Sequence, residues 1–161
     1  MSNLLTDKVK QALIPEPEGT TLIITVGNTL RSDDGVGPFI ASRLSRIKEG
    51  YQLMDVGDRP EDCLDEALAT RPVKTVMIDA ADFGGQPGEI RVVPRELIPE
   101  TTLSTHTFPL PVIAALLEED TGSRVLFIGI QPVRVTLGEG LSSPVRAAAG
   151  EIIQFLDKGE K

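Results

Sequence analysis

The side chains best suited to chemistry in this sequence are four aspartates and one histidine. Asp33 and Asp34 are adjacent, Asp55 and Asp79 each stand near the end of an apolar segment, and His106 is the only histidine. Carboxylates and a neutral imidazole are ligands for a borderline divalent metal such as zinc or nickel. Carboxylates that lie close together repel one another unless a cation or a proton sits between them. These residue types therefore indicate a metal site, provided that the fold brings them together.

The apolar segments that precede the aspartates predict how this happens. Strands are predicted at residues 21–27, 51–56 and 73–79, and each ends close to an acid. If these strands are parallel, the acids share one edge of the sheet, at the carboxyl ends of the strands, where ligands bind in open α/β sheets. His106 lies in an irregular stretch, residues 94–107, that can reach the same edge.

The rest of the chain alternates between helical and strand patterns. Further strands are predicted at 89–93 and 125–130, and helices at 3–13, 35–47, 60–70, 108–119 and 142–156. We expect Gly50 to close the second helix, and a serine cap followed by proline to begin the last one. The loop at 80–88 is too short for a parallel crossover, so strand 89–93 is predicted as a hairpin-like antiparallel edge.

This pattern predicts an α/β fold. We expect a three-layer α/β/α sandwich around a mostly parallel, twisted, five-stranded sheet with one antiparallel strand. A chain of 161 residues fits a single domain. We assign that domain to residues 21–161 and treat residues 1–20 as an N-terminal extension or accessory helix.

Composition excludes several classes of protein. A net charge of −8 disfavours nucleic acid and anionic membranes as partners. No apolar run approaches the roughly 20 residues of a transmembrane helix, and the N-terminus does not resemble a signal peptide. A single cysteine, Cys63, fits a reducing compartment and reads as a core residue. We therefore expect a soluble cytoplasmic protein.

Each candidate residue also has an ordinary structural explanation. An aspartate at a helix start, such as Asp33, is usually an N-cap, although one cap suffices and Asp34 follows it. Asp79 can be a turn residue, and a lone histidine such as His106 is more often structural than a ligand. Singly these explanations prevail, whereas the acids and the histidine at one edge together favour a site.

Other site types fit less well. Gly27, Gly35 and Gly37 do not have phosphate-loop spacing, and the two aspartates at that helix start would repel a phosphate. No serine stands in a GxSxG elbow. Two alternatives stay open, namely a phospho-accepting receiver-like signalling domain and a non-catalytic metal-dependent binding module. The receiver reading is weakened because residues 129–132, Gly-Ile-Gln-Pro, lack the lysine that a receiver uses there.

Four stretches of the chain resemble the nickel–iron hydrogenase maturation endopeptidases, most closely the branch that serves formate-hydrogenlyase-type hydrogenases (hydrogenase 3). The match spans about residues 21–157 and omits the N-terminal extension. The matching stretches are VGNTLRSDDGVGP (26–38), MIDAADFGGQPGEIRVV (77–93), STHTFPLPVIAALLEED (104–120) and FIGIQPVRV (127–135).

The resemblance implies a specific set of site residues. In this family an acid in the first strand's loop, an aspartate after the third strand and a histidine bind a metal, which assigns Asp34, Asp79 and His106. Asp33 is then left to hold the helix start. Asp55 matches another family acid with a supporting or catalytic role. Catalysis is thereby assigned to Asp34 and Asp55.

The resemblance also implies a reaction. The family removes a short C-terminal peptide from the large-subunit precursor of a nickel–iron hydrogenase after nickel insertion, and we expect this chain to act as a monomer. The nickel is supplied by the precursor, and zinc or cadmium can occupy the site in vitro. Either the metal polarises the scissile carbonyl and activates water, or it positions the tail while Asp34 or Asp55 acts as general base.

The loop after the second strand departs from the family pattern. The family often carries a glycine pair followed by a small hydroxyl residue, whereas this chain has Gly57-Asp58-Arg59-Pro60-Glu61. The loop is expected to touch the tail of the substrate, which assigns Gly57 and Asp58 to substrate binding. Which hydrogenase is the substrate stays open.

Overall fold

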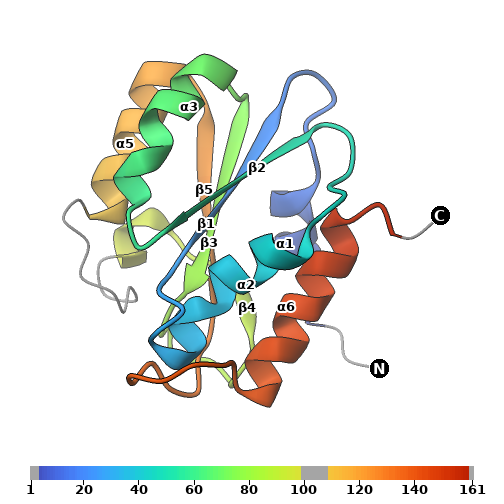
Figure 1. The fold of residues 1–161 in the computed structure, drawn as a ribbon. Helices are drawn as coiled ribbons and strands as arrows, with labels where there is room; N and C mark the ends of the chain where they lie inside the picture. The colour runs from blue at the N-terminus through green and yellow to red at the C-terminus, as the bar shows by residue number, and fades with distance from the viewer. Residues whose placement is uncertain (1–3, 99–108, 160–161) are drawn as a thin grey trace.

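A twisted sheet with the strand order β2-β1-β3-β5-β4 forms the middle layer of the protein (Figure 1). The computed structural model describes residues 4–98 and 109–159. Strands β1, β2, β3 and β5 are parallel, and β4 runs antiparallel to β5, which confirms the predicted sheet. The strands are β1 (Thr21–Val26), β2 (Tyr51–Gly57), β3 (Lys74–Ala80), β4 (Ile90–Val92) and β5 (Arg124–Ile130).

The predicted partner of β4 is wrong, although its place at an edge is right. β4 does not form a hairpin with β3, because β1 and β5 already pair with the two sides of β3. It pairs instead with the outer side of β5, where Ile90 pairs with Ile130 and Val92 with Ile128. The loop that follows β3 therefore passes the end of β5 before the chain turns back.

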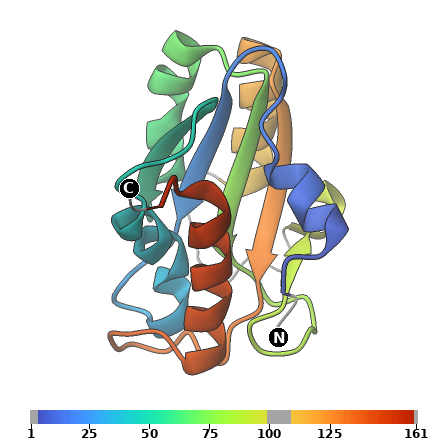
Figure 2. The same cartoon turned by 90° about the vertical axis from the view of Figure 1, so that its right-hand side faces the viewer.

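Helices cover both faces of the sheet, as the two views show (Figures 1 and 2). Each face has its own cluster of buried apolar side chains. Because both faces are covered, all six residues of β1 are buried, which is typical of parallel strands. One face carries α1 (Asp7–Leu13), α2 (Val36–Arg43) and α6 (Ser143–Leu156), and the other carries α3 (Leu64–Thr70) and α5 (Leu110–Thr121).

Several helix ends differ from their predicted positions. The first turn of the predicted helix 35–47 is preceded by a 3₁₀ turn, η1 (Ser32–Gly35), and α2 ends at Arg43. Gly50 does not close this helix, because it lies in the turn before β2 with φ +90° and accepts a hydrogen bond from Thr21 N. Two further 3₁₀ turns are η2 (Pro60–Cys63) and η3 (Arg95–Leu97).

The N-terminal helix α1 belongs to the core of the domain. It begins at Asp7 because the Thr6 side chain accepts a hydrogen bond from Val9 N at 3.3 Å. Val9 and Leu13 are buried in the same cluster as side chains of α2 and α6. The division of the chain near residue 20 stays a prediction. Within the described residues, no helix has the length and apolar character to cross a bilayer.

Candidate active site at the carboxyl edge of the sheet

Two of the predicted ligands, Asp34 and Asp79, lie close together at the carboxyl edge of the sheet. Asp34 sits in η1, which follows β1 and packs against β3, and Asp79 is the penultimate residue of β3. Both side chains are buried. The two strands are neighbours and parallel, so their ends bring the two carboxylates to the same place.

The electrostatics of this pair are unfavourable for two negative charges. Burial raises the pKa of Asp79 well above its usual range, and the charge of Asp34 raises that pKa further. The hydrogen bond that Ala80 N donates to Asp79 Oδ1, at 2.7 Å, opposes this rise without cancelling it. Two carboxylates in this setting are stabilised when a proton or a cation neutralises them.

The donor set fits a divalent cation. Asp79 Oδ2 is buried and accepts no hydrogen bond from the residues that the structure describes. Asp34 Oδ2 accepts one from Asn28 N at 3.1 Å. Carboxylate oxygens of this kind are metal ligands, and a cation would satisfy the buried oxygen and the paired charge together.

The third predicted ligand, His106, lies outside the described residues. Across residues 4–98 and 109–159, no three side chains of histidine, cysteine, aspartate or glutamate form a complete metal-binding group. The structure thus brings Asp34 and Asp79 together, and a site with His106 stays a prediction.

Asp33 does not cap a helix as predicted, but joins two loops. Its buried carboxylate accepts hydrogen bonds from Val133 N at 2.8 Å, Arg134 N at 3.3 Å and Ser142 N at 2.7 Å. The Ser142 hydroxyl also donates to it at 2.8 Å. Ser142, the predicted cap of α6, therefore uses its side chain on Asp33 and makes no side-chain cap.

The glycines around this pair are explained by close packing. A Cβ at Gly37 would lie 2.3 Å from the carbonyl oxygen of Val26, so glycine lets α2 approach the end of β1. Gly27 has φ +150°, and a Cβ there would lie 2.0 Å from the carbonyl oxygen of Asp34. These positions require glycine to bring the Asp34 loop against the strand, which needs no bound phosphate.

Asp55 points to the other face of the sheet from Asp79. It is exposed, and its Oδ1 accepts hydrogen bonds from Thr25 Oγ1 at 2.9 Å and from Gly57 N at 3.3 Å. Thr25 pairs with both Asp55 and Ile78, so these side chains share the face of the sheet that α2 and α6 cover. Asp79 follows Ile78 and points to the opposite face. The catalytic role of Asp55 stays a prediction.

The loop with Gly57 and Asp58 adjoins the start of the Asp34 loop. Gly57 O accepts a hydrogen bond from Gly27 N at 2.8 Å, and Gly57 has a positive φ of 56°. Asp58 is exposed. This loop is thus attached beside the end of β1, and its contact with a substrate stays a prediction.

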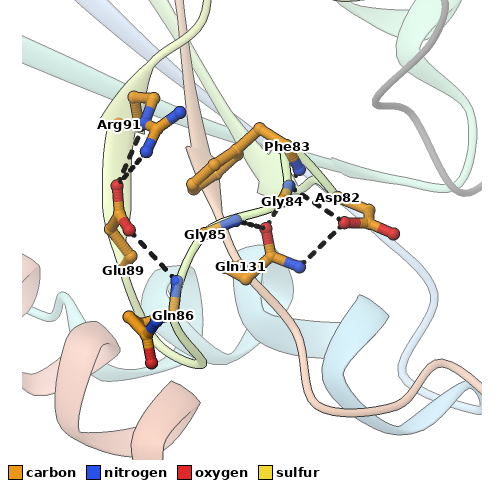
Figure 3. Close-up of polar contacts among 8 residues, drawn as sticks. All are labelled: Asp82, Phe83, Gly84, Gly85, Gln86, Glu89, Arg91 and Gln131. Carbon is orange, nitrogen blue, oxygen red and sulfur yellow. Dashed lines mark hydrogen bonds and ion pairs between the residues drawn. The ribbon is translucent and has the colours of Figure 1, made fainter.

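Gln131 organises the loop that follows Asp79, and reasoning from the sequence did not identify it (Figure 3). Its Oε1 accepts hydrogen bonds from Phe83 N and Gly85 N, both at 3.0 Å, and its Nε2 donates to Asp82 Oδ1 at 3.0 Å. Its backbone carbonyl accepts from Gly88 N at 2.8 Å. One residue at the end of β5 thus holds the chain that leaves β3.

The outer side of the same loop is held by surface contacts (Figure 3). Glu89 accepts a hydrogen bond from Gln86 N at 3.1 Å and pairs with Arg91, whose guanidinium lies 4.4 Å from the centre of the Phe83 ring. Partly exposed ion pairs contribute little to stability. The buried Gln131 contacts are therefore the main restraint on this loop.

These features define an α/β protein with a buried pair of carboxylates at the carboxyl edge of the parallel strands. The chain belongs to the hydrogenase maturation protease family, since the HycI family model, described as hydrogenase maturation protease, matches residues 39–158. The matched region includes Asp55, Asp79 and His106 and begins just after Asp34. The resemblance noted in the sequence is thereby confirmed, and the receiver-like and non-catalytic alternatives give way to an endopeptidase family.

Individual relatives match most of the chain. The hydrogenase 3 maturation protease of Escherichia coli K12 is 33% identical over 143 residues, covering 88% of this chain and 91% of that protein. The HycI nickel–iron hydrogenase maturation protease of Thermococcus kodakarensis has a TM-score of 0.78 at 28% identity, covering 92% and 95%. The endopeptidase HycI from Escherichia coli has a TM-score of 0.77 at 34% identity, covering 86% and 89%.

Proposed function

We propose that this protein removes the C-terminal extension from the nickel-loaded large-subunit precursor of a nickel–iron hydrogenase. The observation that carries the proposal is the buried Asp34–Asp79 pair in a member of the hydrogenase maturation protease family. Buried like charges destabilise a fold, and carboxylates with strongly perturbed pKa values are typical of functional sites. A cation presented by the substrate would neutralise the two carboxylates.

The nickel of the precursor is part of the substrate, and it supplies the positive charge that the carboxylates recognise. Asp34 and Asp79 are its proposed protein ligands, with His106 as the third. Zinc or cadmium would occupy the same ligands in vitro, because carboxylate and imidazole groups discriminate weakly among these metals. A precursor without nickel would leave the carboxylates to repel one another and would dock poorly.

The proposed chemistry is attack by water on the scissile carbonyl. A carboxylate oxygen accepts a proton from the water as its oxygen bonds to the carbonyl carbon, and that proton passes to the leaving nitrogen as the C–N bond breaks. Asp34 is our choice for this base, because it adjoins Asp79 and has a second oxygen for the metal. Asp55 is the alternative, held by Thr25 on the other face of the sheet.

Other parts of the proposal concern the setting of the reaction. Gly57 and Asp58 are proposed to contact the tail of the precursor, because Gly57 O is bonded to Gly27 N at the start of the Asp34 loop. The protein is proposed to act as a monomer in the cytoplasm. The proposed compartment rests on the single cysteine, Cys63, which is buried and has no second cysteine in the chain to form a disulfide.

Cleavage of purified precursor tests the proposal. The full chain is mixed with large-subunit precursor from the same organism, with and without nickel, and the C-terminus is followed by mass spectrometry. We expect a single cut that releases the extension only from the nickel-loaded form. Failure to cleave any nickel-loaded precursor, or equal cleavage with and without nickel, would contradict the proposal.

A further inference from the structure

Two loops form a single hydrogen-bonded rim beside the acidic pair. We define the rim as residues 28–32 and 133–139. Leu30 O accepts a hydrogen bond from Gly138 N at 2.9 Å, and Ser32 N donates to Gly138 O at 2.8 Å. Arg31 Nε donates to Val135 O at 3.2 Å. In Figures 1 and 2 the second loop, in orange-red, runs beside the start of α2.

Hydrogen bonds with two buried polar side chains hold the second loop of the rim in place. The carboxylate of Asp33 binds the backbone of Val133 and Arg134, and the Ser32 hydroxyl donates to Thr136 O at 2.7 Å. Both Ser32 and Asp33 are buried. The outer side chains of the rim are therefore held on a fixed backbone, and a preorganised surface of this kind loses little entropy when it binds.

The rim also concentrates exposed apolar side chains. Leu137 is 86% exposed, Leu30 55% and Val133 51%, and no other large apolar side chain in the described residues exceeds 44%. Single exposed apolar residues are ordinary, whereas several that gather at one place mark an interaction surface. The three most exposed ones in the described chain lie on this one rim.

The charges of the rim differ from those of the whole chain. Arg31 and Arg134 are exposed within it, and Glu139 is its single acid, on a chain whose net charge is −8. Arginine beside apolar side chains is enriched at protein interfaces. A partner that complements the rim carries an apolar surface flanked by carboxylates.

A small pocket extends this surface. It measures about 230 Å³ and is lined by Thr29, Phe39 and Leu141 among others, directly beside the rim. A pocket of this size can receive a side chain of a docked protein, since buried anchors in pockets carry most of the energy of an interface.

We propose that the rim is the docking surface for the folded body of the precursor. The precursor would contact the rim through an apolar patch of its own that is flanked by acidic groups. Residues 30–32 lead directly into Asp33 and Asp34, so a protein whose tail enters the acidic pair places its body against this edge. A second copy of this chain is a poorer occupant, because rim against rim would oppose Arg31 and Arg134 to themselves. The inference rests on the proposed function.

Steady-state cleavage of nickel-loaded precursor tests the surface, with Leu137→Asp and Arg134→Glu compared with the wild-type chain. We expect each change to raise KM about tenfold with kcat within about twofold, since the rim binds the body and does not touch the reacting atoms. Leu68→Asp is the matched control on α3, where Leu68 is exposed on the opposite layer, and its KM stays at the wild-type value. Circular dichroism and the melting temperature verify that each variant folds.

The outcomes separate this inference from the function beneath it. If the wild-type chain cleaves and both rim variants keep its KM, the docking surface is wrong while the function stands. Rim variants that lose kcat at an unchanged KM would also overturn the docking surface. So would sedimentation that shows the wild-type chain as a dimer and Leu137→Asp as a monomer, because the rim would then bind a second copy. If the wild-type chain cleaves no nickel-loaded precursor, the proposed function fails and this inference fails with it.

Discussion

Strand β3 begins with a buried lysine, Lys74, and has a buried aspartate, Asp79, next to its end. The two side chains differ in the charge and the hydrogen bonds of their neighbours. Lys74 Nζ donates a hydrogen bond to Ile14 O and lies 3.6 Å from Glu16 Oε1. Arg124 also pairs with Glu16, at 3.1 Å. Burial lowers the pKa of Lys74, and the charge of Glu16 opposes that change. At this end of the strand, the buried charge has an acceptor and a counter-charge.

Asp79 at the other end has a like charge for its neighbour. Its Oδ2 accepts no hydrogen bond within the described residues, and both burial and Asp34 raise its pKa. A buried charge that the chain itself satisfies is a structural feature, whereas one that it leaves unsatisfied indicates a place for something from outside. The contrast favours a folding role for the amino end of β3 and agrees with the proposed functional role of its carboxyl end.

The largest effect is expected from removing a charge of the acidic pair. Asp34→Asn or Asp79→Asn should lower the cleavage rate about 1000-fold, because each substitution removes a ligand for the nickel of the substrate. Asp34→Asn also removes the proposed general base. The initial rate of release of the C-terminal peptide measures this. Asp65→Asn, an exposed acid on α3, is the control and should cleave normally, whereas a pair variant within tenfold of wild type would break the contrast.

Asp55→Asn sharpens the choice of base. If Asp34 is the base, this variant should keep its cleavage rate within about tenfold of wild type, because Asp55 lies on the other face of the sheet. The measurement is the same peptide release assay. A loss as large as that of Asp34→Asn would transfer the role of base to Asp55.

Asp33 should affect stability strongly. Asp33→Ala removes the acceptor of four hydrogen bonds that join the two loops, and we expect a loss of about 3 kcal/mol, since each stranded buried donor carries a desolvation cost. Urea unfolding at neutral pH measures this loss. Ser142→Ala removes one of these bonds and should cost about 1 kcal/mol. Equal stability of Asp33→Ala and wild type would contradict the anchoring role.

Lys74→Met tests the structural end of β3. It should cost roughly 1–2 kcal/mol because Ile14 O loses its donor, while Glu16 keeps Arg124 and cleavage stays normal. The pKa of Lys74 is lower in the folded state than in the unfolded state. The unfolded state therefore binds more protons between those two pKa values, and stability rises with pH through that window. Melting curves recorded across this alkaline range should show stability rising with pH for wild type and not for Lys74→Met.

Asp79→Asn should have the smallest effect on stability, and it should stabilise the protein where the preceding variants destabilise it. The pKa of Asp79 is raised in the folded state, so the folded protein binds more protons above the ordinary pKa, and stability falls as pH rises through that window. The variant lacks this penalty. At neutral pH it should melt about 2–4 °C above wild type, the shift that ~1 kcal/mol gives in a domain of this size. The difference should disappear in acid, and a lower melting temperature at neutral pH would contradict the account.

The sequence predicts the acidic pair because it follows from local signals. Apolar runs that end at acids predict parallel strands with acids at one edge, and Asp34 and Asp79 meet there. The partner of β4 is not predictable in this way, because it depends on which edges of β3 remain free. Helix boundaries also shift, since capping bonds such as that of Thr6 are decided by single side chains.

The contacts that support the site escape a reading of local patterns. Asp33 binds donors about a hundred residues further along the chain, and Gln131 binds the loop after Asp79 from the end of β5. Nothing in the periodicity near Asp33 distinguishes a helix cap from a bond to a distant loop. Both roles become visible only when the sheet order places β5 beside β3.

The central claim is that the Asp34–Asp79 pair recognises the nickel carried by the precursor. Its most direct test is the affinity of wild type and Asp79→Asn for nickel-loaded and nickel-free precursor, measured by titration calorimetry. We predict that wild type prefers the nickel-loaded form by about 100-fold and that Asp79→Asn loses most of this preference, a coupling of ~2.7 kcal/mol. An equal preference in wild type and variant would contradict the claim.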